Sequence, residues 1–342
     1  AQVVASLGLV SSAGAAMAQA TLNAQQANAQ GTGLQQVVEK VLMTHPEVQA
    51  RFQDFSSSME GQNVARGGWR PQVTAQGWVG REWRSHIQDS PNQDWNRPGW
   101  NLQLRQLIFD GFTTSSNIRQ LGFEKLAKFY DLRSTTESLA NDAVGAYLDV
   151  QRYREMEKLA RENFGTHQVT LGQLRERQQS GVGRGVDLEQ ASGRLSLAQA
   201  NLMTESNNLN DVMQRYRRVV GEYPAAVMDP APEVTAKLPL SGANKDFGDS
   251  LRASPLLLSK QALLQAAEAG QKAAKGAHMP KLEFLASTGR DRDQNSSAYW
   301  DVQSSRVQLM LTYNLYRGGA DEARLRQTIA QGYAAQDVRD YT

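Results

Sequence analysis

The stretch QLRQLIFDGFTTSSNIRQ, residues 103–120, starts with alternating apolar and polar residues, passes through Asp-Gly and continues with a helical pattern. A period of two residues is typical of a β-strand with two different faces, whereas apolar residues at three- and four-residue steps indicate a helix. Residues 308–327, QLMLTYNLYRGGADEARLRQ, make the same transition around Gly-Gly. The sequence therefore predicts two strands that each run directly into a helix.

Both transitions belong to an internal repeat. Residues 45–81 align with residues 254–290 at an offset of 209 positions, and after a loop that is two residues shorter in the second copy the alignment continues at an offset of 207. A constant register on each side of one length change indicates a duplicated structural unit. The matched positions include Pro46 with Pro255, Pro71 with Pro280, Phe109 with Tyr316, and Gly111 with Gly318.

Each copy predicts one helix followed by one β-hairpin. The first proline suits the first turn of a helix of about 20 to 25 residues, and the second proline cannot continue that helix. Alternating residues then predict hairpins over residues 71–110 and 280–317, the second alternation continuing to Leu315. Polar positions on the first hairpin are candidates for the water-filled side of a membrane barrel: Thr74, Gln76, Gln103 and Arg105. Aromatic residues gather toward the hairpin ends, as in interfacial girdles: Trp83, Trp100, Trp300, Tyr313 and Tyr316.

Two long helices follow the first hairpin. Residues 112–179 contain no proline and repeat apolar residues at helical steps, which predicts a helix on the order of 100 Å long. A turn, SGVGRGVD at residues 180–187, leads into a returning helix over residues 187–221. Segments rich in Pro, Gly and Ala, near residues 22–45 and 222–253, are interpreted as connections at the equator of the molecule.

Composition excludes several classes of function. The net charge is +2, the basic residues form no dense run, there is no cysteine, and the four histidines lack metal-ligand spacing. We therefore expect no nucleic-acid binding, no metal site, no cofactor and no catalysis. Residues 1–18 are interpreted as the remnant of a secretory signal peptide, with a flexible apolar tail as the alternative.

The order of these features resembles the TolC family of outer-membrane efflux and secretion channels over roughly residues 34–342. The resemblance rests on the duplicated Pro-initiated helix, the hairpins, the junctions LIFDG and LYRGG, and the Gly-Val-Gly turn followed by Asp187 and Leu188. It implies an α+β membrane protein, in which a homotrimer closes one 12-stranded outer-membrane β-barrel, with four strands per chain, that continues as a periplasmic α-helical barrel. The implied partners are outer-membrane lipid, a periplasmic adaptor (membrane fusion protein) and an inner-membrane transporter.

The same resemblance assigns a role to the helix-to-helix turn. Glycines at alternate positions can also indicate a nucleotide-binding loop, but here they follow a helix and no Walker lysine is present. The resemblance implies a tip that contacts the adaptor through Gly181, Val182, Gly183, Arg184 and Gly185. Charged residues near this turn are candidates for ion pairs that hold the aperture closed, with solvated helix faces as the alternative: Arg175, Glu176, Arg177, Asp187 and Glu189.

The two copies differ in length. The first extends some 110 residues beyond Gly111, whereas the chain ends 24 residues after Gly318. We therefore expect a first repeat over residues 19–221, a linker over residues 222–253, and a truncated second repeat over residues 254–342.

The functional expectation is an exit duct of a tripartite type I protein secretion system, located in the outer membrane and extending into the periplasm. The preference for secretion rests on overall resemblance and on the missing lipid-anchor cysteine. A multidrug efflux pump is the alternative within the family. A soluble periplasmic coiled-coil adaptor is the alternative of a different class, because adaptors also contain long paired helices.

Overall fold

The computed structural model describes residues 33–84, 93–231, 248, 251–293 and 300–342. The predicted signal remnant, residues 1–18, lies outside the described residues. The chain divides into a first unit, Ala1–Ala50 with Thr135–Ser241, and a second unit, Arg51–Ser134 with Gly242–Thr342.

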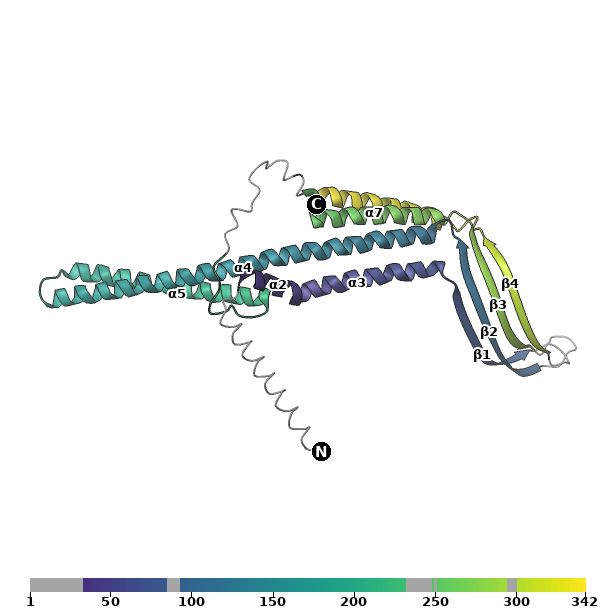
Figure 1. The fold of residues 1–342 in the computed structure, drawn as a ribbon, viewed down its shortest axis with the longest axis horizontal. Coiled ribbons are helices and arrows are strands. Elements are labelled where there is room, and N and C mark those ends of the chain that lie inside the picture. Colours follow the sequence, from purple (N-terminus) through teal and green to yellow (C-terminus); the bar gives the residue numbers. More distant parts are fainter. Residues whose placement is uncertain (1–32, 85–92, 232–247, 249–250, 294–299) are drawn as a thin grey trace, which may run out of the picture. The chain divides into compact units, whose positions relative to one another are not determined.

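The helices and strands of the described residues carry the numbering used in Figure 1. The helices are α2 (Leu34–Thr44), α3 (Pro46–Arg66), α4 (Thr113–Gln179), α5 (Gly185–Val220), α7 (Pro255–Gly276) and α8 (Ala320–Tyr341), and a 3₁₀ turn spans Gly67–Trp69. The strands are β1 (Gln72–Arg84), β2 (Gln93–Phe109), β3 (Lys281–Asp293) and β4 (Trp300–Thr312). No helix among these combines the length and hydropathy needed to span a membrane.

The helices begin near the predicted positions. Helices α3 and α7 start at Pro46 and Pro255, and α4 is continuous over 67 residues. Helix α5 starts at Gly185, two residues before the expected start at Asp187. The first N–H groups of any helix lack an intrahelical partner, so glycine is tolerated in this first turn.

Helix α2 was not predicted, because its residues lie in a stretch interpreted as a connection. Val37 and Val41 are almost fully buried, 2% and 1% exposed, at a spacing of four residues. The burial of one helical face explains why this short segment is ordered as a helix.

The core of the first unit surrounds two tyrosines. Tyr147 and Tyr216 are 0% and 1% exposed. Tyr147 Oη donates a hydrogen bond to the carbonyl of Asp229 at 2.6 Å, and Arg154 Nη1 donates to the carbonyl of Ala226 at 3.2 Å. These bonds fix the segment that follows α5. Burial is the main cause that raises the pKa of Tyr216 to about 12, and the nearby Glu222 adds to it.

The second unit holds the sheet, whose order is β1-β2-β3-β4 with every neighbouring pair antiparallel. Both hairpins therefore join one sheet through the contact of β2 with β3. Strand β4 ends at Thr312, opposite Lys281. The expected continuation to Leu315 is wrong, because the next position on β3 is Pro280, which has no N–H for the ladder.

Small side chains bring α7 close to its neighbours. Its buried residues recur at three- and four-residue steps: Ser259, Ala262, Ala266, Ala269, Ala273 and Gly276. Ser259 Oγ donates to Asp131 Oδ1 of α4 at 2.6 Å, and α7 packs along α8. Helix α3 contacts α4 through larger groups, with ring centroids of Phe55 and Phe129 5.9 Å apart.

Candidate functional site

The sheet has one polar face, which contains the four residues predicted to line the lumen. Thr74 lies opposite Gln103, and Arg105 lies opposite Gln72, so alternation places Gln76 on the same face. The register continues this face across β3 and β4 through Ser287, Ser304, Arg306 and Gln308. Pairing thus joins polar residues from both repeats into one surface. The four residues predicted to line a lumen therefore share one face of the sheet. That this face lines a lumen is a proposal.

The opposite face is apolar and exposed in the single chain. It carries Val73, Ala75, Val79, Leu102, Leu104, Phe284, Ala286, Val307, Leu309 and Leu311. Leu309 and Leu311 are 66% and 67% exposed, and Val79 is 87% exposed. Soluble monomers rarely expose an apolar surface of this extent, so this face requires a lipid or protein environment.

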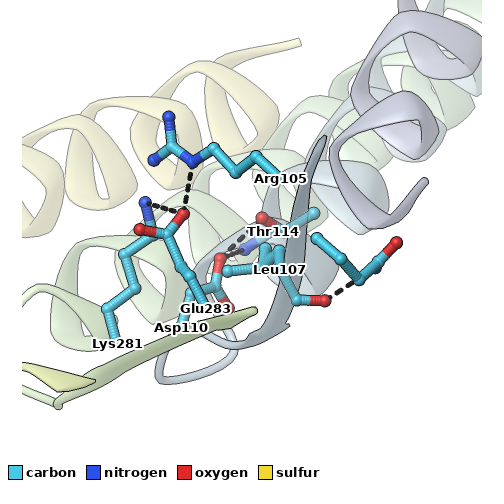
Figure 2. Close-up of polar contacts among 7 residues, drawn as sticks. Arg105, Leu107, Asp110, Thr114, Lys281 and Glu283 are labelled. Atoms are coloured by element: carbon cyan, nitrogen blue, oxygen red, sulfur yellow. Dashed lines mark hydrogen bonds and ion pairs between the residues drawn. The ribbon is translucent and has the colours of Figure 1, made fainter. Parts of the chain in front are cut away.

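An ion cluster crosses from the first repeat to the second on the polar face (Figure 2). Arg105 Nε donates to Glu283 Oε1 at 2.6 Å, and Lys281 Nζ lies 3.0 Å from the same oxygen. Glu283 is only 7% exposed. Two cations compensate the burial of this carboxylate, and the cluster links β2 to β3. The sequence indicated the polarity of Lys281 and Glu283 but not their cross-strand partner.

The first strand-to-helix junction is closed within the chain. Asp110 Oδ2 accepts hydrogen bonds from Thr114 N at 2.8 Å and from Thr114 Oγ1 at 2.5 Å, which caps α4 (Figure 2). Gly111 has φ +66°, and a Cβ there would lie 2.7 Å from the carbonyl oxygen of Gly276. Only glycine allows this close approach of α4 to the end of α7.

The second junction also runs from a strand into a helix, but in the described part of the single chain no other element packs against its glycines. Gly318 and Gly319 have φ +62° and +78°, and a Cβ at either residue would meet no atom within 4 Å. Leu315 and Tyr316 beside them are 86% and 84% exposed. Arg317 Nη1 lies 3.1 Å from Asp321 Oδ1.

The predicted girdle residues occupy different positions. Trp83 and Trp100 lie at register positions of the apolar face and are 70% and 44% exposed. Tyr313 and Tyr316 follow β4 and are exposed. Trp300 is the first residue of β4, opposite Asp293 on β3.

The predicted tip is a tight turn between α4 and α5. The N–H groups of Val182 and Gly183 both donate to the carbonyl of Arg177, at 3.0 and 2.9 Å. Gly181 has φ +77°, and a Cβ on Gly183 would lie 2.8 Å from Gln178 N. Glycine is required at both positions. The turn thereby presents Val182, 85% exposed, with Arg184 as the N-cap and Gly185 as the first residue of α5.

The charged residues near the tip form no ion pair with one another in the described part of a single chain. All five are exposed: Arg175, Glu176, Arg177, Asp187 and Glu189. Their predicted role in an aperture therefore depends on contacts between copies.

The matching family model is the outer membrane efflux protein family, over residues 37–222 and 248–341. The chain is 25% identical over 269 residues to the outer membrane efflux protein BepC of Brucella suis, covering 78% of this chain and 57% of that protein. It is 25% identical over 322 residues to the outer membrane protein TolC of Escherichia coli, covering 87% of this chain and 62% of TolC. The chain thus spans about three fifths of the length of these curated relatives.

Solved structures share the fold at lower sequence identity. A membrane protein from Pseudomonas aeruginosa matches with a TM-score of 0.78 and 16% identity, covering 90% of this chain and 72% of that chain. The CmeC outer membrane channel of Campylobacter jejuni matches with a TM-score of 0.77 and 14% identity, covering 90% and 67%.

The two-faced sheet and the long helices therefore define the fold of an outer-membrane channel subunit. The chain belongs to the outer membrane efflux protein family, as its resemblance to the TolC family indicated, and this membership places it in the outer membrane. The Brucella relative is described as an outer membrane efflux protein, and the Campylobacter neighbour as an outer membrane channel.

Proposed function

We propose that three copies of the chain close a 12-stranded barrel in the outer membrane and form the exit duct of a tripartite export machine. The observation that carries the proposal is the four-stranded sheet with one polar and one exposed apolar face. Membrane barrels need at least about eight strands and have no open edge. Strands β1 and β4 are the edges of this sheet, so other copies must supply their neighbours.

The proposed barrel assigns the two faces. The apolar face contacts lipid, and the polar face with Thr74, Gln76, Gln103 and Arg105 lines a water-filled lumen. The α-helices continue the duct into the periplasm. Transport through it is passive, with energy supplied by an inner-membrane transporter.

The tip is the proposed contact with a periplasmic adaptor. Support comes from the exposure of Val182 and from the glycines that hold the turn in one conformation. The charged residues on both sides of the turn are proposed to pair between copies around the aperture. Exposed pairs contribute only about 0 to 1 kcal/mol each, so a closed aperture needs several equivalent pairs.

The proposed cargo is a protein exported by a type I system. A second candidate is drug efflux, which is favoured by the printed descriptions of the family and of the Brucella relative. Both candidates use the same duct and differ in the transporter behind it.

The test introduces Val182→Cys into the full chain in cells and captures neighbours with a thiol-reactive crosslinker. We expect an adaptor at the tip, and the transporter recovered with that adaptor distinguishes protein secretion from drug efflux. A matched Val169→Cys variant, also exposed on α4, controls for non-specific capture. Capture of no adaptor, together with a chain that remains soluble without detergent, would favour the soluble coiled-coil alternative.

A further inference from the structure

A surface pocket of about 470 Å³ lies between the start of α4 and the end of α7. Its lining includes Ser115, Ser116 and Arg119 from α4, together with Lys272 and Lys275 from α7. Phe112 and Met279 line the end nearest the sheet. The pocket is therefore basic at one end and apolar at the other.

Close backbone packing fixes the walls of the pocket. A Cβ on Gly276 would lie 2.2 Å from Thr113 Oγ1 and 2.7 Å from the carbonyl oxygen of Gly111. Thr113 Oγ1 also donates to the carbonyl of Ala273 at 3.4 Å. The two helix ends cannot rotate past each other without breaking these contacts.

The positive charge in the pocket is not neutralised by the chain. No carboxylate lines it, and among the described residues Arg119, Lys272 and Lys275 form no ion pair. The nearby Asp110 carboxylate accepts hydrogen bonds from Thr114 through Oδ2. Three adjacent cations repel one another, and a bound anion removes that repulsion.

The apolar end of the pocket is exposed as well. Phe112, at φ +67°, is 63% exposed, and Met279 is 48% exposed. Arg119 lies seven residues beyond Phe112, which is about 10 Å along a helix. A ligand that fits this arrangement has an anionic head and an apolar tail that points toward the sheet.

The internal repeat shows that the fold does not require this cluster. At the equivalent positions of the repeat, Glu322 on α8 replaces Ser115, and Asn63 and Arg66 on α3 replace Lys272 and Lys275. Arg326, the equivalent of Arg119, lies 3.7 Å from Glu322. The second junction therefore neutralises its arginine within the chain, whereas the first leaves three cations for an external anion.

The contacts of α4 indicate which way the pocket opens in the proposed barrel. At 100° per residue, contacts with α3 centre near Ile118 and Lys125, and contacts with α7 centre near Thr113 and Gln120. The angle between these directions is about 140° on one side and about 220° on the side of Arg119. In a closed ring of helices the smaller angle faces inward, so the pocket faces outward.

We propose that this pocket binds the phosphate of an anionic phospholipid where the barrel meets the inner surface of the outer membrane. The cations and serine hydroxyls bind the phosphate, and an acyl chain lies over Phe112 and Met279 against the apolar face of the sheet. This inference rests on the proposed function, which places that face in lipid.

The test measures retention of dioleoyl phosphatidylglycerol and dioleoyl phosphatidylcholine by the full chain, using native mass spectrometry from detergent. The variant Lys272→Gln/Lys275→Gln removes two cations, and Arg66→Gln/Arg326→Gln, which removes the cations equivalent to Lys275 and Arg119 in the repeat, is a matched control. Each cation near a membrane surface contributes about fivefold to binding, so the first variant should bind phosphatidylglycerol about 25-fold more weakly. The control and the wild type should bind it equally and prefer it to phosphatidylcholine.

Two results would overturn the inference: equal retention of phosphatidylglycerol by the lysine variant and the wild type, or an equal loss in the control. A further arm adds inorganic phosphate or glycerol 1-phosphate. Displacement of the lipid by either at matched concentration would show a site for free phosphate and refute the lipid assignment. Conductance of the same samples in planar bilayers separates the two proposals, since a conducting channel without selective lipid retention refutes only the pocket.

Discussion

The two strand-to-helix junctions occupy equivalent positions in the repeat but differ in what completes them. At the first junction Gly111 packs against Gly276 at the end of α7, whereas at the second Gly318 has open space around it. The repeat places Gly67, at the end of α3, where Gly276 stands in the other copy. A single chain therefore completes one junction, and the proposed trimer completes the other by packing the second junction of one copy against the end of α3 of the next.

The largest expected effect comes from filling the closed junction. Gly276→Val would force its side chain against Thr113 and Gly111, and we expect a loss of about 3 kcal/mol or more in the free energy of unfolding. The equivalent Gly67→Val meets no atom within 4 Å in the single chain, so it should leave the folding of the chain intact and impair assembly. Denaturation followed by circular dichroism, with the mass of the assembly, distinguishes them. Equal stability of Gly276→Val and wild type would contradict the packing.

Removing the apolar groups of the open junction should weaken assembly. Leu315→Ser/Tyr316→Ser deletes two exposed side chains that the proposed interface buries, with an expected loss of about 2 to 4 kcal/mol per interface. The concentration at which the assembly dissociates, measured by sedimentation, should rise by at least tenfold. Leu256→Ser, an exposed leucine on α7, is a control for lower surface hydrophobicity. An unchanged dissociation concentration in the double variant would show that this surface is not an interface.

An alkaline titration tests whether the first unit unfolds at a lower pH than the second unit, which contains both junctions. The raised pKa of Tyr216 stabilises the folded state fully below about pH 10, and this contribution is lost as the pH rises toward about 12. The difference of about two pKa units corresponds to at most about 2.7 kcal/mol. All six tryptophans belong to the second unit, so helical circular dichroism should fall before tryptophan emission changes. Tyr216→Phe should retain helicity to higher pH, and identical curves for both proteins would contradict the assignment.

The smallest expected difference in stability is between variants of Asp110 and of Arg317, its equivalent in the repeat. Asp110→Ala removes the cap of α4 and should cost about 1 to 2 kcal/mol of stability. Arg317→Ala, at the equivalent position of the second junction, removes only an exposed pair with Asp321 and should cost about 0 to 1 kcal/mol. Urea denaturation of the two variants compares these costs, and a larger loss for Arg317→Ala would reverse the comparison.

Much of the fold was predictable because it follows local periodicity. The prolines define the starts of α3 and α7, and alternation defines the two faces of each strand. The unpredicted features depend on contacts between distant segments. Helix α2 is ordered by the burial of Val37 and Val41, and β4 ends at Thr312 because its partner strand begins after Pro280.

In the candidate sites, too, the features set by local sequence were predictable and those set by contacts between distant segments were not. Alternation places Thr74 with Gln76 and Gln103 with Arg105, and the register of β1 with β2 brings the two pairs onto one face. The partner of Arg105 depends on the register between β2 and β3, which the sequence does not reveal. The pocket likewise combines cations from α4 and α7 that are about 150 residues apart in the chain.

The central claim is that copies of this chain share one barrel, and the mass of the detergent-solubilised protein tests it most directly. We predict a single species of about three times the 37.7 kDa of one chain, measured by native mass spectrometry. A monodisperse 37.7 kDa species that needs no detergent would contradict the account.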